Sequence, residues 1–536
     1  MGISSQLTAI RVLAGAGAAR PSRPDRLLGM GLALMRWGFT PAAGWAAGAV
    51  RYPHEAAIID ELGAMTFLEI DQASSGVATA LTERGVRDGG SIGLLMRNSR
   101  WMPIALSAVA KAGADAVLLN TGFGAEQLGD VMQREGIQAV IYDEEFDPLL
   151  AEAPADLLRV VGWSDGEVEL PTVAELADTP PRLTRPAHRG RQVILTSGTT
   201  GTPKGASRSV EGIEPAAAFL SGIPLRARET TVIAAPLFHA WGLAHLGLGL
   251  LLSSTLVLSR RFDPERLLAL VDEHRASALV VVPVMMQRML ELPEKVRERY
   301  DTSSLKVVAV SGSALPGELS TRFMDAFGEV VHNLYGSTEV AYATVASPAD
   351  LREAPGTAGR LLLGTTITLV DPEGNEVPQG EVGRIFVGNP LLFTGYTGGE
   401  DKDRLGNLVA SGDLGRFDAQ GRLFIEGRDD EMIVSGGENV FPAEVEELLS
   451  KHPSVREAAV VGVEDEKMGQ RLVAYVVKHA KSVSEDELKA LVKDRLARHK
   501  VPREVHFIDE LPRNETGKIV KRKLQAPDCT ESGGGS

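Results

Sequence analysis

The stretch Val193-Ile194-Leu195-Thr196-Ser197-Gly198-Thr199-Thr200-Gly201-Thr202-Pro203-Lys204-Gly205 is the most informative part of this chain. Three apolar residues, typical of a buried strand, lead directly into a loop of small hydroxyl and glycine residues that ends in a lysine. Glycines let the backbone approach a polyanion closely, and successive N–H groups can form an anion-binding nest. The pattern therefore predicts a phosphate-binding loop at the end of a strand.

Each residue type in this loop has an expected part in phosphate binding. The hydroxyl groups are expected to donate hydrogen bonds, the glycines to let the backbone come close, and the lysine to supply a positive charge. The hydroxyl residues are Thr196, Ser197, Thr199 and Thr200, the glycines are Gly198 and Gly201, and the lysine is Lys204. The loop is not a P-loop, because that motif places Ser or Thr after a Gly-Lys pair, whereas Lys204 follows a proline. An ordinary flexible surface turn is the alternative, and the density of hydroxyl and glycine residues argues against it.

Size and charge limit the class of protein. A chain of 536 residues is too long for one hydrophobic core and suggests two or more domains. The formal net charge of −15 argues against nucleic acid as the main partner. The single cysteine, Cys529, allows neither a disulfide framework nor a cysteine-based metal site, and it fits a reducing compartment such as the cytoplasm.

The N-terminal 51 residues have an unusual charge pattern. Six arginines stand against one acidic residue, Asp25, and apolar residues are interleaved with them: Leu27, Leu28, Met30, Leu32, Leu34, Met35, Trp37 and Phe39. This composition fits an amphipathic helix on a membrane surface, with peripheral contact at the inner membrane. A helix packed on the main domain is an equal alternative.

Short apolar runs alternate with helical patterns over the first two thirds of the chain. Strands are expected at residues 92–96, 116–119, 139–142, 231–234, 278–282 and 307–310, with a helix at 101–112. Strands that alternate with helices predict parallel α/β sheets covered on both faces. Residues 364–424 change to an alternating pattern with turns, which predicts a smaller, more antiparallel β unit.

A compact pattern of strands and helices follows Arg428. Strands are expected at residues 458–463 and 472–477, and a helix is expected to begin at Pro442. A second helix is expected to begin with a capping box formed by Ser484 and Glu487 and to end at Pro502. We therefore expect an N-terminal segment (1–51), a large α/β domain with the β unit (52–429), a small mobile α+β domain (430–526) and a flexible tail (527–536).

Further motifs follow the phosphate loop in a fixed order. They are Ala235-Pro236-Leu237-Phe238-His239-Ala240-Trp241-Gly242, Val310-Ser311-Gly312-Ser313-Ala314-Leu315-Pro316, Asn333-Leu334-Tyr335-Gly336-Ser337-Thr338-Glu339, Ser411-Gly412-Asp413-Leu414-Gly415, Gly427-Arg428-Asp429-Asp430-Glu431, Ser435-Gly436-Gly437-Glu438 and Leu511-Pro512-Arg513-Asn514-Glu515-Thr516-Gly517-Lys518. Taken with the phosphate loop, this series resembles the adenylate-forming superfamily, and in particular its acyl-CoA synthetases. The resemblance extends from about Tyr52 to Leu524.

The resemblance implies roles for residues of the large domain. His239 would lie between the acyl carboxylate and the thiol channel, and Trp241 would form a wall of the acyl pocket. The loop Gly312-Ser313-Ala314 would line the adenine and acyl sites. Tyr335 would stack on adenine beside Gly336, an interaction that contributes about 1–3 kcal/mol for a base on an aromatic ring. Thr338 would donate to the α-phosphate, and Glu339, with Thr199, would bind Mg²⁺.

The resemblance also implies roles for residues near and beyond the domain boundary. Asp413 would accept the ribose hydroxyls, and Arg428 would contact ribose and phosphate. Asp430 falls at the hinge about which the C-terminal domain rotates. Gly437 would line the pantetheine tunnel after that rotation, and Lys518 would bridge the carboxylate and the α-phosphate during adenylation.

The function implied is activation of a carboxylic acid with ATP and Mg²⁺, followed by transfer to coenzyme A. We expect the acid to be a medium- or long-chain fatty acid. Two features favour a lipid: the acyl region is apolar and rich in small residues, and the N-terminal segment could face a membrane. Three alternatives stay open: a ligase for aromatic or other carboxylates, an acyl-AMP ligase that serves a carrier protein, and an inactive nucleotide or lipid binder. Association into oligomers is left open as well.

Overall fold

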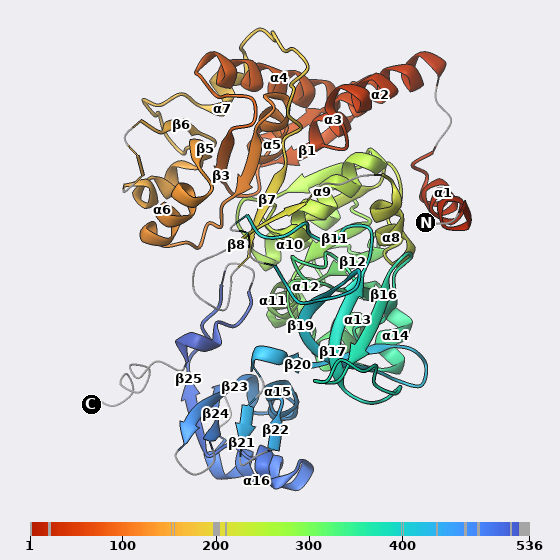
Figure 1. Cartoon of the computed structure of the whole chain (residues 1–536), viewed down its shortest axis with the longest axis vertical. Helices are drawn as coiled ribbons and strands as arrows, with labels where there is room; N and C mark the ends of the chain where they lie inside the picture. Colours follow the sequence, from red (N-terminus) through yellow and green to blue (C-terminus); the bar gives the residue numbers. More distant parts are fainter. Residues whose placement is uncertain are drawn as a thin grey trace.

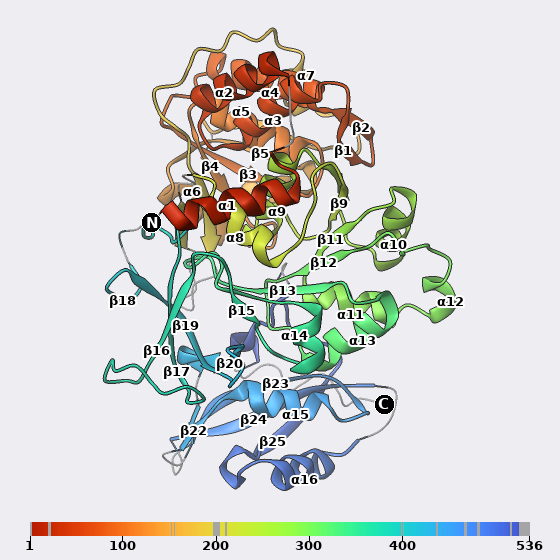
Figure 2. The ribbon, with the colours of Figure 1, turned by 90° about the vertical axis from the view of Figure 1, so that its right-hand side faces the viewer.

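The structure is a computed structural model with a large mixed α/β body and a small C-terminal domain below it (Figure 1). It describes residues 3–19, 23–151, 153–154, 156–196, 204–208, 212–397, 399, 401–431, 433–435, 438–465, 469–479, 483–514 and 517–524. Two large sheets and a small β unit form the body, and a fourth sheet forms the C-terminal domain. The view turned by 90° shows the same order of layers from top to bottom (Figure 2).

A six-stranded sheet forms the upper part of the body. Its strands, in spatial order, are β6 (Leu158–Val161), β5 (Ile137–Tyr142), β3 (Ser91–Leu95), β4 (Asp115–Leu118), β7 (Gln192–Thr196) and β8 (Lys204–Arg208). All neighbours are parallel except β7 and β8, which pair antiparallel with Thr196 opposite Lys204. The predicted phosphate loop therefore connects the two strands of a hairpin.

Helices cover both faces of this sheet, as the sequence predicted. The elements around it are α4 (Phe67–Glu83), α5 (Trp101–Lys111), α6 (Ala125–Arg134), the 3₁₀ helix η1 (Glu144–Leu150) and α7 (Val173–Ala177). Neighbouring residues of one strand belong to different cores: Leu94 is buried in the largest core, whereas Leu95 is buried in a second one with α6. This alternation follows from the two-residue period of a strand.

A nine-stranded sheet forms the centre of the body. In spatial order it contains β15 (Arg360–Leu361), β14 (Thr344–Ala346), β13 (Val331–Tyr335), β12 (Val307–Val310), β11 (Ala278–Val281), β9 (Thr230–Ile233), β10 (Thr255–Leu258), β1 (Ala56–Asp60) and β2 (Gly63–Thr66). The strands from β13 to β1 are parallel, and the pairs at the two edges are antiparallel. Its helices are α8 (Glu214–Gly222), α9 (Ala240–Leu252), α10 (Pro264–Glu273), α11 (Pro283–Glu291), α12 (Glu294–Arg297), α13 (Gly317–Phe327) and α14 (Pro348–Glu353).

The predicted antiparallel β unit lies between the body and the C-terminal domain. It contains β16 (Thr366–Val370), β17 (Gly383–Gly388), β18 (Arg404–Leu405), β19 (Leu408–Phe417) and β20 (Leu423–Arg428), and all its pairs are antiparallel. Its core, around Phe393 and Leu423, also buries Ala206 of β8 and Val340 from the loop after β13. The unit thus packs against parts of both large sheets.

The C-terminal domain has its own sheet and its own cores. Its elements are η2 (Asp429–Glu431), β21 (Ile433–Ser435), β22 (Glu438–Val440), α15 (Pro442–Ser450), β23 (Val455–Asp465), β24 (Gly469–Lys478), α16 (Glu485–Arg495), η3 (Arg498–Lys500), β25 (Glu504–Ile508) and η4 (Lys521–Lys523). Helix α15 begins at Pro442, as predicted.

Two predictions for helix α16 need correction. The Ser484 side chain accepts from the backbone N–H of Glu487, but the reciprocal bond that completes a capping box is not formed. The Glu487 carboxylate instead lies 3.4 Å from His452 of the neighbouring segment. The helix ends at Arg495 rather than at Pro502, because the chain turns through η3 before it reaches the proline.

The N-terminal segment forms three helices, α1 (Ile3–Ala16), α2 (Pro24–Trp37) and α3 (Pro41–Arg51). Helix α3 is an integral part of the core: an added Cβ at Gly48 would lie 2.3 Å from the ring of Phe67, and one at Gly44 would lie 2.9 Å from Leu250. Helix α2 packs chiefly on α3 and lies at the outer end of the molecule (Figures 1 and 2). Within the described residues, no helix has the length and apolar character needed to cross a bilayer.

Replacing Gly359 with alanine should destabilise the body. Gly359 has φ +89°, and an added Cβ would lie 2.1 Å from backbone atoms of Val345 and Ala346. Gly380 has a similar φ of +96°, but a Cβ added there would have no neighbour within 4 Å. We expect Gly359→Ala to cost about 1–3 kcal/mol or more, and Gly380→Ala to cost clearly less, in urea unfolding curves. Equal losses would show that the contact at Gly359 is unimportant.

Candidate active site

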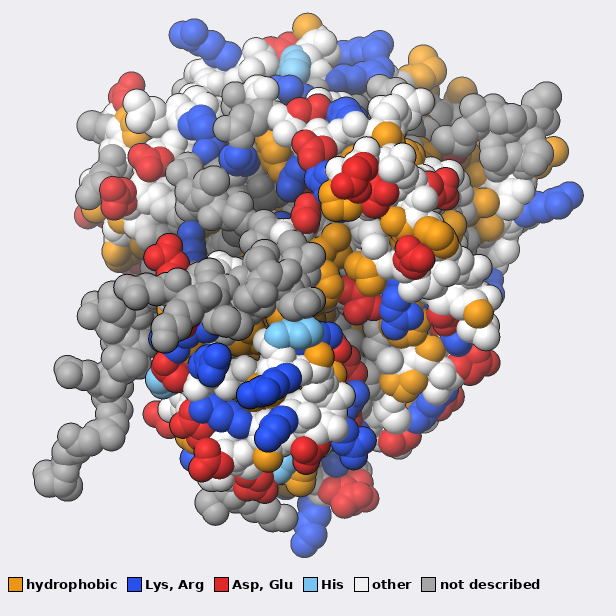
Figure 3. Space-filling view, turned by 60° about the horizontal axis from the view of Figure 1, so that its bottom comes forward, with side chains coloured by type: hydrophobic (Ala, Val, Ile, Leu, Met, Phe, Trp, Pro, Cys, Tyr) orange, Lys and Arg blue, Asp and Glu red, His pale blue; other side chains and the backbone are white. Residues whose placement is uncertain are grey.

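One cavity of about 840 Å³ lies where the central sheet, the β unit and the C-terminal domain meet. In the space-filling view, many charged side chains cover the outer surface of the C-terminal domain, and apolar side chains are visible at its border with the body (Figure 3). The cavity is lined by the following site residues predicted from the sequence: Lys204, His239, Trp241, Gly312, Ser313, Ala314, Tyr335, Gly336, Thr338, Glu339, Asp413, Arg428 and Lys518. Residues that lie up to 314 positions apart in the chain thus share one site.

A buried carboxylate, Glu339, stands at the end of the loop after β13. Its two oxygens accept hydrogen bonds from Tyr396 Oη at 2.7 Å and Ser337 Oγ at 2.8 Å. Burial raises the pKa of Glu339, but these donors and the charge of Lys402 outweigh burial, so that the net shift is downward. The group is therefore ionised at neutral pH and available to a cation.

Tyr396 connects Lys204 with Glu339, because its ring contacts the lysine and its hydroxyl donates to the carboxylate. The Lys204 ammonium lies 5.5 Å from the centre of the Tyr396 ring, within the range of a cation–π contact. The position of Tyr396 is fixed by a bridge to Ala206 of β8 and by a hydrogen bond of 2.8 Å from Thr397 N to Gly205 O. The strand that follows the phosphate loop is thus attached to the β unit beside Glu339.

A second polar group contains Tyr335, Asp413 and Arg428. The Tyr335 hydroxyl donates to Asp413 Oδ2 at 2.7 Å, and Arg428 Nη1 lies 3.7 Å from Asp413 Oδ1. Burial raises the pKa of Asp413, although the Tyr335 hydrogen bond and the charges of Arg428 and Lys518 oppose that shift. The aromatic ring and the carboxylate thus line the cavity side by side, an arrangement suited to a base and its sugar.

His239 and Trp241 form an apolar wall at the start of α9. Burial lowers the pKa of His239 to about 4, so the ring is neutral at physiological pH. Its Nε2 is buried and has no hydrogen-bond partner among the described residues. Trp241 is fixed by a 3.1 Å hydrogen bond from its Nε1 to Val281 O and by an edge-on contact with His245, with ring centres 4.2 Å apart.

Lys518 enters the cavity on a tight turn of the C-terminal domain. Its backbone N–H donates to Asn514 Oδ1 at 2.8 Å, and its carbonyl accepts from Asn514 N at 2.9 Å. The preceding Gly517 has φ +76°, and a Cβ there would lie 2.3 Å from Val284 of α11. The turn is therefore pressed against the large domain, and only glycine fits at the contact.

Several site residues predicted from the sequence cannot be placed in the cavity, because they lie outside the residues that the structure describes. Ser197, Gly198, Thr199, Thr200, Gly201 and Gly437 lie outside the described residues, as do the side chains of Thr196 and Asp430. The backbone of Asp430 belongs to the short turn η2, directly after β20.

Sequence reasoning missed Tyr396 and Lys402. Both line the cavity and both help to lower the pKa of Glu339. They lie in an irregular segment between β17 and β18 that has neither helical nor strand periodicity. Only an aromatic residue beside Gly395 could have drawn attention to it, and such pairs are common in turns.

Comparison with known proteins agrees with this geometry. Residues 45–397 match the family described as AMP-binding enzyme, and residues 444–518 match the AMP-binding enzyme C-terminal domain. The chain belongs to the AMP-binding enzymes. These adenylate-forming enzymes are the superfamily that the sequence motifs resemble, and their combination of a large α/β domain with a small C-terminal domain is the fold seen here.

Individual AMP-binding enzymes cover nearly the whole chain. Feruloyl-CoA synthase of Amycolatopsis sp. is 34% identical over 481 residues, 88% of this chain and 96% of that protein. The solved anthranilate CoA ligase in complex with anthranoyl-AMP is 27% identical with a TM-score of 0.80, covering 90% of this chain and 96% of that chain. The amide bond synthetase of Marinactinospora thermotolerans is also 27% identical with a TM-score of 0.80, covering 90% and 98%.

Removing the Tyr396 hydroxyl should change the pH dependence of activity at limiting Mg²⁺. A group whose pKa is lowered by its donors stays ionised to lower pH, so loss of a donor lets protons compete with the cation at higher pH. For Tyr396→Phe we expect the acidic limb of the pH–rate profile to move up by about one unit, the size expected for one hydrogen bond to a charged group.

Tyr300→Phe provides the matched control for this test. The Tyr300 hydroxyl also donates to a glutamate, Glu265 at 2.9 Å, but the pair lies outside the cavity. The acidic limb of the pH–rate profile of Tyr300→Phe should coincide with that of the wild type. An unchanged profile in Tyr396→Phe would show that Glu339 does not bind the cation.

Proposed function

We propose that this AMP-binding enzyme is a carboxylate–CoA ligase that works through an acyl-adenylate. A carboxylate oxygen attacks the α-phosphorus of ATP, the bond to pyrophosphate breaks, and acyl-AMP forms. The sulfur of coenzyme A then attacks the acyl carbon, the carbon–oxygen bond to AMP breaks, and the thiol proton goes to solvent. The observation that carries the proposal is that Glu339, Asp413 and Lys518 share one cavity with a neutral histidine.

The described residues fit ATP and Mg²⁺. Tyr335 and Asp413 would hold adenine and ribose, and Lys204 would contact the phosphates. Among the described residues no group of three His, Cys, Asp or Glu side chains could hold a metal alone, so a cation at Glu339 would complete its shell with phosphate oxygens and water. When bound, Mg²⁺ would neutralise phosphate charge during the first half-reaction.

Two anions must meet in the first half-reaction, so neutralisation and positioning matter more than a covalent nucleophile. Lys518 supplies a positive charge from the domain opposite Glu339, and it is close enough to Asp413 to lower the pKa of that group. We propose that this domain orientation serves adenylation, and that rotation at Asp430 replaces Lys518 by the Gly437 loop for thioester formation. The rotating part would be residues 430–526. The fixed part would be residues 52–429 together with helix α3 of the N-terminal segment, which is packed into the same core, and the tail would lie outside both.

For the acid, we propose an aromatic carboxylate. This was an alternative in the sequence analysis, and the comparisons support it better than the medium- or long-chain fatty acid expected there. The names of two relatives specify ferulate and anthranilate, which are aromatic acids. Trp241 adds a structural argument, because a ring fixed by a hydrogen bond and by His245 makes a flat, rigid wall that suits a flat acyl group.

The acceptor is the second open choice. One structural neighbour is named an amide bond synthetase, which makes an amine an alternative to coenzyme A. A carrier protein and an inactive nucleotide or lipid binder remain as rivals from the sequence analysis. The presence of both Glu339 and Lys518 in one cavity argues against an inactive binder, which needs neither a cation ligand nor a cation placed on a separate domain. We also propose that the enzyme is cytoplasmic and contacts the membrane peripherally. That contact would be made by the N-terminal segment and not by the active site.

Substrate class can be tested by pyrophosphate release with ATP, Mg²⁺ and matched aromatic and aliphatic acids, with and without coenzyme A. We expect kcat/KM for the best aromatic acid to exceed that for the best aliphatic acid by at least about tenfold, the scale on which apolar pockets discriminate. Trp241→Ala should reduce this ratio. A higher kcat/KM for long-chain aliphatic acids would restore the fatty-acid assignment. If product formed with amines but not with coenzyme A, the acceptor would be an amine.

The role of Lys518 can be tested by separating the two half-reactions. Lys518→Ala should slow acyl-AMP formation by about 10²–10³, the loss seen when one transition-state charge donor is removed. It should leave thioester formation from supplied acyl-AMP close to wild type. Lys523→Ala, an exposed lysine on the same segment outside the cavity, is the control and should spare both steps. Equal loss in both half-reactions would contradict domain rotation.

A further inference from the structure

Helix α2 has an apolar face that points outward. Counted at 100° per residue, one arc of about 160° contains only Pro24, Leu27, Leu28, Gly31, Leu32, Leu34 and Met35. The large apolar side chains of this arc, and Phe39 just beyond it, are between 43% and 67% exposed: Leu27, Leu28, Leu32, Leu34, Met35 and Phe39. The opposite side of the helix, with Ala33 and Trp37, is buried.

This orientation is unusual for a helix on the surface of a protein in water. A surface helix normally turns its apolar stripe to the core and its charged residues to solvent. Contiguous apolar patches of this kind mark interaction sites. Helix α2 also precedes the residues that match the family, which begin at residue 45, so the common catalytic fold does not account for it.

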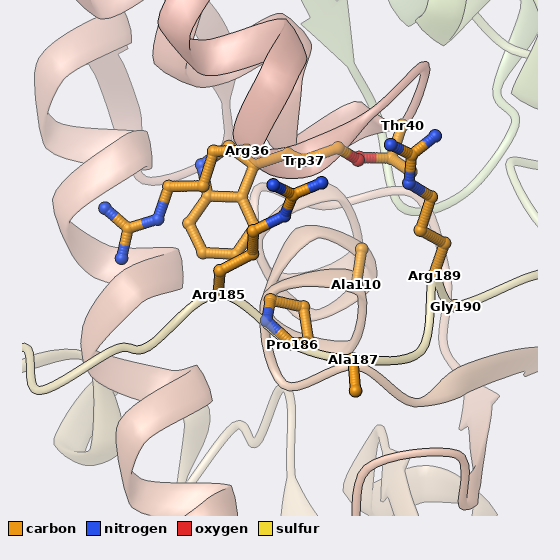
Figure 4. Close-up of a pocket in the computed structure, with 9 residues that line it drawn as sticks. All are labelled: Arg36, Trp37, Thr40, Ala110, Arg185, Pro186, Ala187, Arg189 and Gly190. Carbon is orange, nitrogen blue, oxygen red and sulfur yellow. The ribbon is translucent and has the colours of Figure 1, made fainter.

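A cationic cavity of about 230 Å³ lies at the C-terminal end of the same helix. Arg36, Trp37 and Thr40 line it from α2 and the loop that follows, and Arg185 and Arg189 line it from the segment that leads to β7. The lining contains three arginines and no acidic residue. In Figure 4 the guanidinium groups of Arg185 and Arg189 lie between Trp37 and Thr40 and close to Thr40, whereas that of Arg36 extends on the other side of the Trp37 ring.

The segment that carries two of these arginines is held firmly. Asp88 accepts from the backbone N–H groups of Ala187 at 2.7 Å and His188 at 3.0 Å, and a Cβ at Gly190 would lie 2.0 Å from Ala114 O. The neighbouring Arg191 is neutralised by Asp115 at 2.7 Å.

The arginines of the cavity differ from Arg191 in their partners. Within the described part of the chain, Arg185 and Arg189 have neither an ion pair nor a hydrogen bond from their side chains, whereas Arg36 donates to Leu183 O at 2.8 Å. Arg185 and Arg189 are therefore available to an external anion, and Arg36 has further N–H donors besides the one bonded to Leu183.

We propose that the outward face of α2 docks on an anionic phospholipid bilayer, with lipid phosphate groups bound by Arg36, Arg185 and Arg189. The exposed leucines and Met35 would enter the acyl boundary in the plane of the surface, as amphipathic helices do, and the arginines at the end of the face would supply attraction to anionic headgroups. Charge favours this occupant, because a cavity lined by three arginines and no acidic residue complements an anionic lipid surface.

Co-flotation with vesicles tests the proposal on the full-length enzyme. Vesicles of phosphatidylcholine alone are compared with an equal mixture of phosphatidylcholine and phosphatidylglycerol. We expect the wild type to float with the mixed vesicles, and to do so less at high salt. Failure of the wild type to bind the mixed vesicles overturns the proposal.

Two variants separate the apolar and the charged contributions. Leu28→Gln with Met35→Gln should lower vesicle affinity by at least about tenfold, because two buried apolar side chains are lost. Leu62→Gln with Leu361→Gln is the matched control, since both leucines are similarly exposed but lie elsewhere. Arg185→Gln with Arg189→Gln should lower affinity for mixed vesicles by about fivefold for each arginine, whereas the exposed pair Arg266→Gln with Arg322→Gln should not.

Other occupants give different results. Stabilisation of the wild type by inorganic phosphate without vesicle binding would show a site for a small anion and overturn membrane docking. A dimer in light scattering that dissociates in Leu28→Gln with Met35→Gln, without vesicle binding, would assign the face to a second copy. Pyrophosphate release in solution should be unchanged in all these variants, because none of the residues lines the active-site cavity, so the ligase proposal is tested separately.

Discussion

The active site depends on how the loop after β13 is held against the segment from Asn389 to Thr397. The Asn389 side-chain amide donates to two carbonyls of that loop, those of Val340 and Tyr342, each at 2.7 Å. Phe393 N donates to Glu339 O at 3.0 Å, and Tyr396 donates to the Glu339 carboxylate. Because the same segment is bonded to β8, three separate parts of the fold meet at one carboxylate.

This arrangement explains why the loop can hold a strained conformation. Ala341 has φ +58°, a region that residues with a Cβ seldom adopt. Such a conformation costs on the order of 1–3 kcal/mol and persists only where surrounding contacts fix it. Here the hydrogen bonds from Asn389 to the residues on both sides of Ala341 supply those contacts, and they present Glu339 to the cavity.

The pKa values of two cavity residues, His239 and Glu339, are both lowered, but the resulting charge states differ. Burial keeps His239 neutral, whereas hydrogen bonds keep Glu339 ionised although it too is buried. The difference follows from the partners, since Glu339 has two donors and the Nε2 of His239 has no partner among the described residues. Glu339 therefore keeps a negative charge for a cation, whereas His239 lines the same cavity as a neutral ring.

The elements of the fold and the order of the motifs follow from the amino-acid sequence alone. Strands β3, β4, β5, β9, β11 and β12 were predicted within one or two residues, because apolar periodicity is a local property of the chain. Tyr335, Glu339, Asp413 and Lys518, which line the cavity, could be picked out from the sequence because each lies in a compact motif. Long-range packing was needed to decide which of these side chains touch, to bring Tyr396 and Lys402 into the site, and to fit Gly517 closely against Val284.

Packing also set the direction of the apolar face of α2. The periodicity of the sequence reveals that the helix has such a face. Whether that face meets a core or solvent depends on the arrangement of distant segments.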